Sequence, residues 1–292
     1  MFRRLKPLPF KRKRIETPDD DFLDIDLLEN GSDKIVLLCH GLERSSASTY
    51  IQATATLLAD NGYAIAAMNY RFCSGEINRQ LVTYHSGRTE DLHTVIKTLL
   101  PNYKAMYLVG FSLGGNLVLK YNGDGEYALD SKIKASVAVS VPIDLYSSAV
   151  KLQALENRLY SWRFIRTLSK KVCLKHQQYP DQVPIEQLKK VKKLIDFDEY
   201  FTSVLNGFKD ARDYYAKASA APFLSSISKP TLLINALDDP FLTTSCFPYQ
   251  EAKDNPYFHF LTPRYGGHVG FVSSGKQYWS EQQILKFLDA NF

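Results

Sequence analysis

The segment Gly-Phe-Ser-Leu-Gly, residues 110–114, places a serine between two glycines in a G-x-S-x-G pattern. A hydrophobic, strand-like run at 105–109 precedes it, and a helical pattern begins at Leu113. In this context the pattern is typical of a nucleophile elbow, because the glycines leave room for a sharp turn that exposes the serine. The hydroxyl group would lie at a helix N-terminus, where the dipole favours negative charge. We therefore interpret Ser112 as a candidate nucleophile. The alternative is a glycine-rich turn whose serine caps the helix.

A nucleophilic serine needs a histidine base and an acid that orients the histidine. In a strand–turn–helix architecture of this kind, the three residues follow one another as serine, acid and histidine. Two histidines near the C-terminus compete for the role of base. His259 lies in a strand-like run and is interpreted as structural, whereas His268 lies in a glycine-rich loop before the final helical pattern. We predict His268 as the base.

The acid is expected after the strand-like run 231–236, which leads into Leu-Asp-Asp-Pro at 237–240. Either Asp238 or Asp239 could orient the histidine. Proteins of this architecture often carry G-x-x-D-x-x-x-P after this strand, and aligning Ala236 with the first glycine favours Asp239 as the acid. Asp238 would then be a turn residue, a common role for aspartate near proline.

Acyl transfer develops negative charge on a carbonyl oxygen, which needs two preorganised N–H donors. The backbone amide of Leu113, next to the serine, is one candidate. His-Gly-Leu at 40–42 follows the first buried strand, and we predict the amide of Leu42 as the second donor because Gly41 permits the turn. His40 is interpreted as a residue that braces this loop and not as a catalytic group.

The sequence predicts neither a metal nor a cofactor. His85 and His93 are eight residues apart, which is neither one face of a helix nor a known ligand spacing. The four cysteines form no C-x-x-C pair and are too scattered for a disulfide framework. No nucleic-acid-binding motif accompanies the basic charge, so we expect no nucleic-acid partner.

The elements that must position these residues alternate between strands and helices. The chain has 292 residues, of which 45% are hydrophobic and 23% charged, as in a globular protein. The alternation predicts an α/β fold with a mainly parallel, doubly wound sheet flanked by helices. The predicted strands span 22–28 (at a sheet edge), 34–39, 63–69, 105–109, 133–141, 231–236 and 257–261, and the predicted helices span 48–61, 89–100, 113–121 and 277–288.

Two segments interrupt this alternation. Residues 142–229 are helix-rich, basic and aromatic, without a clear strand, and they are too long for a loop. We predict them to be a helical cap inserted into a single domain that spans 21–292. Residues 1–20 are basic and lack periodicity, so we predict an N-terminal arm there.

The charge is unevenly distributed over a chain whose formal net charge is +5. Eleven basic and three acidic residues lie between 151 and 193, and seven basic residues lie between 1 and 14. We favour a solvated surface balanced by nearby acids; the alternative is peripheral contact with an anionic membrane. No apolar run is long enough to cross a bilayer and the N-terminus lacks a secretory signal, so we expect a cytoplasmic location.

Several separated segments of this chain resemble the YheT-like esterase group of α/β-hydrolases. The resemblance implies a Ser–Asp–His triad that hydrolyses esters of short- to medium-chain acyl groups without a cofactor. The chain departs from the group at Phe72, where a small residue, commonly glycine, is usual, and the departure would reshape the pocket floor. Cys73, in the same loop, is interpreted as a buried structural thiol. The matching segments are HGLERSSASTY (40–50), NYRFCSGEINR (69–79), YHSGRTEDL (84–92), GFSLGGNLVLKY (110–121), ARDYYAKAS (211–219), NALDDPF (235–241) and GGHVGF (266–271).

These features predict a serine hydrolase that cleaves carboxylic esters through an acyl-enzyme, with the cap binding the acyl or alcohol part. An acyltransferase would use the same triad with an alcohol as acceptor. A lipid-active variant is compatible with the basic cap and arm. A non-catalytic binding protein that retains the fold is the remaining alternative, but it has no need of a serine, an aspartate and a histidine at these positions.

Overall fold

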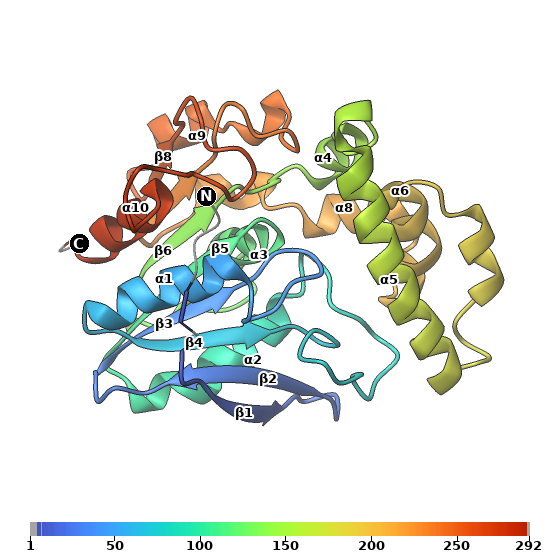
Figure 1. Ribbon diagram of the computed structural model, residues 1–292, viewed down its shortest axis with the longest axis horizontal. Helices are drawn as coiled ribbons and strands as arrows, with labels where there is room; N and C mark the ends of the chain where they lie inside the picture. The colour runs from blue at the N-terminus through green and yellow to red at the C-terminus, as the bar shows by residue number, and fades with distance from the viewer. Residues whose placement is uncertain (1–4, 7, 291–292) are drawn as a thin grey trace.

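The computed structural model describes residues 5–6 and 8–290. An eight-stranded sheet in the order β1-β2-β4-β3-β5-β6-β7-β8 forms its centre (Figure 1). Strands β3 to β8 run parallel, whereas β2 pairs antiparallel with β4 and with β1. The strands are β1 (Lys11–Glu16), β2 (Phe22–Leu28), β3 (Lys34–Cys39), β4 (Ala64–Asn69), β5 (Ala105–Phe111), β6 (Ile133–Val139), β7 (Thr231–Ile234) and β8 (Phe258–Leu261).

Helices cover both faces of the sheet, as the strand–helix alternation predicts. The predicted strands and helices are present, with ends that differ by at most two residues. The short helix α9 was not predicted. The helices are α1 (Thr49–Asp60), α2 (Thr89–Leu99), α3 (Leu113–Gly123), α4 (Leu145–Lys151), α5 (Arg158–Gln178), α6 (Leu194–Phe197), α7 (Ser203–Leu205), α8 (Ala211–Ala218), α9 (Tyr249–Asp254) and α10 (Trp279–Leu288).

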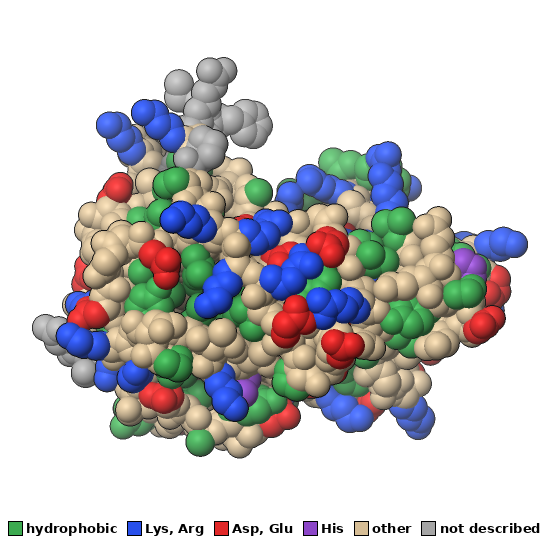
Figure 2. Space-filling model, turned by 90° about the horizontal axis from the view of Figure 1, so that it is seen from below, with side chains coloured by type: hydrophobic (Ala, Val, Ile, Leu, Met, Phe, Trp, Pro, Cys, Tyr) green, Lys and Arg blue, Asp and Glu red, His purple; other side chains and the backbone are tan. Residues whose placement is uncertain are grey.

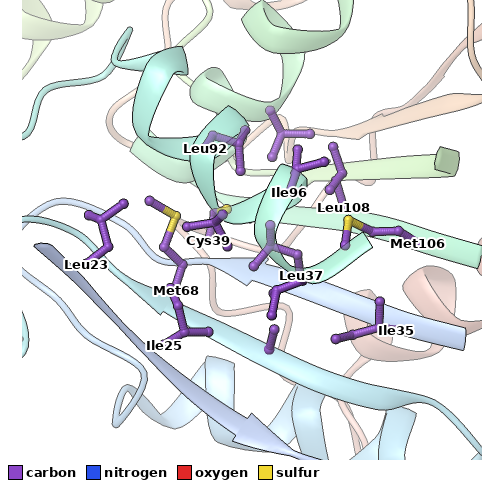
Figure 3. Close-up of a cluster of buried hydrophobic side chains, with 14 of the residues drawn as sticks. Leu23, Ile25, Ile35, Leu37, Cys39, Met68, Leu92, Ile96, Met106 and Leu108 are labelled. Atoms are coloured by element: carbon purple, nitrogen blue, oxygen red, sulfur yellow. The ribbon is translucent and has the colours of Figure 1, made fainter. Parts of the chain in front are cut away.

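The side chains of the central strands alternate between two hydrophobic layers, because successive residues of a strand point to opposite faces. In β3, Ile35, Leu37 and Cys39 pack in the layer that α2 and α3 cover. Figure 3 shows this layer, with Leu92 and Ile96 of α2 lying over the strand residues. The intervening β3 residues pack in the opposite layer, beneath α1 and α10. Burial on both faces explains why the parallel strands read as continuous apolar runs.

The N-terminal arm predicted for 1–20 is wrong for residues 11–16, which form the edge strand β1. Because β1 pairs with β2, the prediction that 22–28 lies at a sheet edge is wrong too. Arg12 and Arg14 of β1 stand opposite Asp26 and Asp24 of β2 and form ion pairs with them at 2.8 Å. Such cross-strand pairs stabilise a strand without apolar periodicity. The charges of these two arginines are therefore balanced locally, which agrees with the favoured interpretation of the charge.

The chain between β6 and β7 contains helices α4 to α8 and no strand. We refer to residues 142–229 as the cap. In Figure 1 the cap helices lie together beside the sheet, and α5, the longest of them, runs across the group. One face of α5 faces inward, where Leu168 and Val172 are buried among other cap residues.

Basic and acidic side chains are interspersed over the face of the molecule in Figure 2, which is viewed from the side of β1 and β2. Among the described residues, no helix is long and apolar enough to cross a membrane.

Candidate active site

Ser112 lies in a strained turn between β5 and α3. Its backbone φ is +53°, in the left-handed region, which a non-glycine residue adopts only when the surrounding structure holds it there. Gly110 and Gly114 make the turn possible by close approach. A Cβ on Gly110 would lie 2.2 Å from the Gly114 carbonyl oxygen, and one on Gly114 would lie 2.4 Å from the Cys39 carbonyl oxygen. The turn therefore depends on its own glycines and on the neighbouring end of β3.

Hydrogen bonds connect Ser112, His268 and Asp239 in that order. The Ser112 Oγ atom lies 2.9 Å from His268 Nε2. On the other side of the ring, His268 Nδ1 lies 2.9 and 3.1 Å from the two carboxylate oxygens of Asp239. A carboxylate only accepts hydrogen bonds, so Nδ1 carries the proton and Nε2 is free to accept the serine proton. This arrangement can transfer a proton from the hydroxyl group as a nucleophile forms.

Asp238 faces away from this chain and has a different set of partners. One of its carboxylate oxygens accepts hydrogen bonds from the amides of Gly266 and Gly267, both at 2.8 Å. These glycines directly precede His268, so Asp238 ties the histidine loop to the turn after β7. Of the two aspartates that the sequence leaves open, Asp239 contacts the histidine and Asp238 holds its loop.

Phe241 contacts the histidine ring, a feature that was not predicted. Its ring centroid lies 4.2 Å from that of His268, with the planes tilted by 39°. On its far side it packs against Tyr160 and Phe164 of the cap helix α5. In the sequence it is the last residue of the matching segment NALDDPF, but nothing there indicates a contact with the histidine. Its position between the ring and the cap depends on the tertiary structure.

The loop at 40–43 is held on both sides of Leu42. The amide of Gly41 donates to the Tyr50 hydroxyl at 2.9 Å, and the amide of Glu43 donates to the Tyr84 hydroxyl at 3.0 Å. Within the described part of the chain, no hydrogen bond uses the amide of Leu42 or that of Leu113. Two free amides are what a developing oxyanion requires.

His40 is fully buried beneath this loop and braces it. Its Nδ1 atom donates to the Gly41 carbonyl at 2.8 Å, and the Tyr70 amide donates to its Nε2 atom at 3.4 Å. The Tyr70 hydroxyl also donates to the His40 carbonyl at 3.0 Å. Burial lowers the pKa of His40 to about 3, so the ring stays neutral. These contacts agree with the interpretation of His40 as a bracing residue.

A cavity opens beside Ser112 and His268, between the sheet and the cap. Its empty space, including the part open to solvent, is about 1120 Å³. Apolar side chains from both sides dominate its wall: Leu42, Phe72, Leu113, Leu145, Ala149, Leu152, Phe164, Leu168, Val172, Leu194, Phe197, Phe201, Leu205 and Phe241. A wall of this kind accommodates a hydrocarbon chain.

One polar part of the cavity wall lies around Asp198. This residue begins a single π-helical turn, Asp198–Thr202, a local irregularity that is frequent at functional sites. Its carboxyl group accepts hydrogen bonds from the hydroxyls of Thr202 and Tyr215, both at 2.6 Å. Burial raises the pKa of Asp198 to about 6, although the two hydroxyls lower it. The cavity therefore combines a long apolar wall with a buried acid that the sequence did not single out.

The remaining residues that the sequence singled out lie apart from the serine–histidine–aspartate chain. His259 lies on β8, with its ring 5.5 Å from that of Phe287. His85 is buried at the cavity wall, and His93 stacks on Tyr127 with ring centroids 4.0 Å apart. Among the described residues, no group of three His, Cys, Asp or Glu side chains could hold a metal ion.

Phe72 and Cys73 lie at the border between the sheet and the cap. Phe72 has a φ of +61°, in the region that favours glycine, which gives a physical reason for the usual small residue at this position. Its side chain lines the cavity. Cys73 is partly buried, and burial raises the pKa of its thiol to about 11. The Cys73 Sγ atom lies 3.3 Å from Lys171 Nζ of the cap. The residues next to Cys73 in the sequence do not indicate this partner.

Comparisons with known proteins agree with this geometry. The sequence model of the α/β hydrolase fold matches residues 34–259. The "Putative esterase YheT" of Escherichia coli is 34% identical over 99% of this chain and 87% of its own length. Human "Phospholipase ABHD3" is 31% identical over 91% of this chain and 68% of its own length. The "Monoacylglycerol lipase" of Saccharomyces cerevisiae is 30% identical over 95% of this chain and 63% of its own length.

Among solved structures, the Pyrococcus furiosus esterase Pf2001 superposes with a TM-score of 0.64 and is 18% identical, covering 96% of this chain and 91% of that one. At this identity the likeness concerns the fold alone. The sequence comparisons, the eight-stranded sheet and the strained serine turn lead to one conclusion: the chain belongs to the α/β-hydrolase family, in its YheT-like group.

Proposed function

We propose that this protein is a serine hydrolase that cleaves carboxylic esters, with Ser112 as nucleophile, His268 as base and Asp239 as orienting acid. The observation that carries the proposal is the hydrogen-bonded chain from Asp239 through His268 to Ser112 at the wall of an apolar cavity. The names of the relatives, an esterase, a lipase and a phospholipase, point to the same class of reaction.

In the proposed mechanism, the Ser112 oxygen attacks the ester carbonyl while His268 Nε2 takes the hydroxyl proton. Asp239 stabilises the imidazolium that forms, and the amides of Leu42 and Leu113 hold the oxyanion. The histidine then gives its proton to the leaving alcohol, and an acyl-serine remains. A water molecule, deprotonated by the same histidine, attacks this ester and releases the carboxylic acid and the free serine.

The proposed substrates are esters with a short- to medium-chain acyl group or a lipid-like ester. The apolar cavity wall supports this choice, since burying each CH₂ group of an acyl chain contributes about 0.8 kcal/mol. Hydrolysis and transfer to an alcohol proceed through the same acyl-serine and differ only in whether water or an alcohol attacks it.

Peripheral contact with an anionic membrane is the second part of the proposal. Helix α5 carries six Lys or Arg residues and no Asp or Glu. Four of the six are exposed, namely Arg158, Arg163, Arg166 and Lys170. On and before this helix, Leu155, Leu159 and Trp162 are 79%, 73% and 56% exposed, respectively. Exposed apolar side chains among cations are the combination that binds an anionic bilayer surface. The cytoplasmic location stays a prediction.

The test is hydrolysis of p-nitrophenyl esters from acetate to dodecanoate by the natural sequence and by Ser112→Ala. We expect activity that peaks at one chain length and falls at least about 10⁴-fold in the variant. Ser131→Ala, at an exposed serine away from the site, is the matched control and should keep full activity. Adding glycerol as an acceptor separates hydrolysis from transfer, because an acyltransferase would form mainly the glyceryl ester.

Activity that survives in Ser112→Ala would refute the proposed nucleophile. A fluorophosphonate label extends the test to substrates outside the ester series. It should modify the natural sequence and Ser131→Ala but not Ser112→Ala, and an unreactive Ser112 would refute catalysis by this site.

A further inference from the structure

Glu43, the residue after Leu42, is held through both its backbone amide and its carboxylate. Its φ is +53°, a left-handed conformation that costs free energy for a residue with a Cβ atom. Its carboxylate Oε1 atom accepts hydrogen bonds from the Tyr84 hydroxyl and from Lys171 Nζ, both at 2.7 Å. The Glu43 side chain is only 5% exposed. Surrounding contacts therefore fix this strained backbone position.

Lys171 reaches this loop from the cap, 128 residues further along the chain. Its ammonium group also lies 5.4 Å from the ring centroid of Phe72 and 5.1 Å from that of Tyr84. Lys171 and Phe72 line both the cavity beside Ser112 and a second, outer hollow that Glu43 borders. The ion pair thus belongs to the wall between the reaction site and this outer hollow.

The ion pair bears directly on the proposed oxyanion donor. The carboxylate of Glu43 and its backbone amide bind the same Tyr84 hydroxyl, which closes a small ring around the residue. The peptide that precedes Glu43 contains the Leu42 carbonyl and is joined through the Leu42 Cα atom to the peptide that carries the Leu42 amide. A change in the Glu43 backbone would therefore shift that amide through Leu42. Lys171 is the cation that neutralises the buried carboxylate in this ring, and removing it would leave an uncompensated charge.

We propose that Lys171 and Glu43 are positioning residues, which hold the Leu42 amide at the oxyanion and make the rate of reaction depend on the placement of cap helix α5. This inference rests on the proposed function. It adds a structural link between the cap and the chemistry: the cap not only forms the acyl-binding wall but also completes the oxyanion site through one ion pair.

The test uses the full chain with Lys171→Met, Lys171→Arg and Glu43→Gln, and p-nitrophenyl acetate as a small substrate. Removing an oxyanion donor costs about 10²–10³-fold in kcat, and misplacing one costs part of that. We expect kcat to fall about 10–100-fold in Lys171→Met and Glu43→Gln, with KM changed less than about twofold. Lys171→Arg, which can keep the ion pair, should recover most of the rate. Lys170→Met, at the exposed neighbouring position on α5, should behave as the natural sequence.

The inhibition constant of an alkylboronic acid distinguishes a role at the oxyanion site from a role in stability alone. Its adduct with a serine is tetrahedral and places an oxygen where the oxyanion forms, so its inhibition constant should rise by the factor by which kcat falls. The double variant Glu43→Gln/Lys171→Met should lose no more than the worse single variant, because the two residues act as a unit.

Unchanged kcat and boronate inhibition in both single variants would overturn the inference, and so would additive losses in the double variant. An equal loss in Lys171→Arg and Lys171→Met, accompanied by a matching fall in melting temperature, would assign Lys171 to stability alone. Loss of the proposed function itself has a different signature, which is activity that persists in Ser112→Ala.

Discussion

Asp238 and Asp239 are adjacent and chemically identical, so the pair of variants Asp238→Asn and Asp239→Asn tests the site with an internal control. The Asp239 carboxylate lies 2.9 Å from His268 Nδ1 and is buried. For unit charges at that distance and an effective dielectric constant of about 20, the attraction to the imidazolium is about 6 kcal/mol. Since about 1.4 kcal/mol corresponds to tenfold in rate, Asp239→Asn should lower kcat by up to about 10⁴-fold.

Asp238→Asn should have a small effect, because an asparagine side-chain oxygen can still accept hydrogen bonds from the amides of Gly266 and Gly267. We expect its kcat to stay within about tenfold of the natural sequence, with a slightly lower melting temperature. The assay is hydrolysis of p-nitrophenyl butyrate under saturating substrate, with thermal unfolding of each variant measured in parallel. If Asp238→Asn loses more activity than Asp239→Asn while both remain folded, the assignment of the acid is refuted.

Two further predictions concern the cap. Reversing the charge of Lys189, Lys190, Lys192 and Lys193 to glutamate should lower hydrolysis of a lipid ester in anionic vesicles at least about tenfold, since each cation near such a surface contributes about 1 kcal/mol. Activity on soluble esters should not change, and equal losses on both substrates would contradict the membrane contact. Burial raises the pKa of Asp198 to about 6. Between pH 4 and 6 the folded protein therefore keeps a proton on Asp198 that the unfolded chain releases. As a result, the contribution of Asp198 to the free energy of unfolding falls as the pH rises through this range. Denaturant unfolding of Asp198→Asn should therefore show a gain over the natural sequence that grows from near zero at pH 4 to about 3 kcal/mol at pH 7.5, and a pH-independent difference would contradict this reasoning.

The strands and helices that could be predicted from the sequence are those whose pattern of apolar residues indicates which side chains are buried. The parallel strands are continuous apolar runs because both of their faces are covered, and the helices carry one apolar stripe. Strand β1 escaped prediction because it is stabilised differently. Its residues are mostly exposed, and its arginines pair across the strand with Asp24 and Asp26. The alternation of arginines in one segment and aspartates in the next is the signal that could have identified this pairing.

The residues of the candidate site differ in how far the sequence predicts them. The nucleophile could be predicted because the glycines that its turn requires stand beside Ser112 in the sequence, although Gly114 permits a close approach to Cys39 of the distant strand β3. His268 follows from chain order and from the glycines beside it. Phe241, by contrast, lies in a segment that resembles the family, but nothing in the sequence indicates its contact with the histidine. Its role against the histidine ring appears only when α5 packs on its other face.

The sequence by itself determined the alternation of strands and helices and the glycine pattern around the serine, because periodicity and turn residues are properties of short segments. The order of the candidate serine, acid and histidine along the chain is likewise a property of the sequence. Only the tertiary structure decided which of two aspartates meets the histidine, which residues wall the cavity and that Lys171 binds Glu43 across 128 residues. The physical reason is that periodicity reports whether a side chain is buried, whereas its partner is selected by the packing of segments that are distant in the chain.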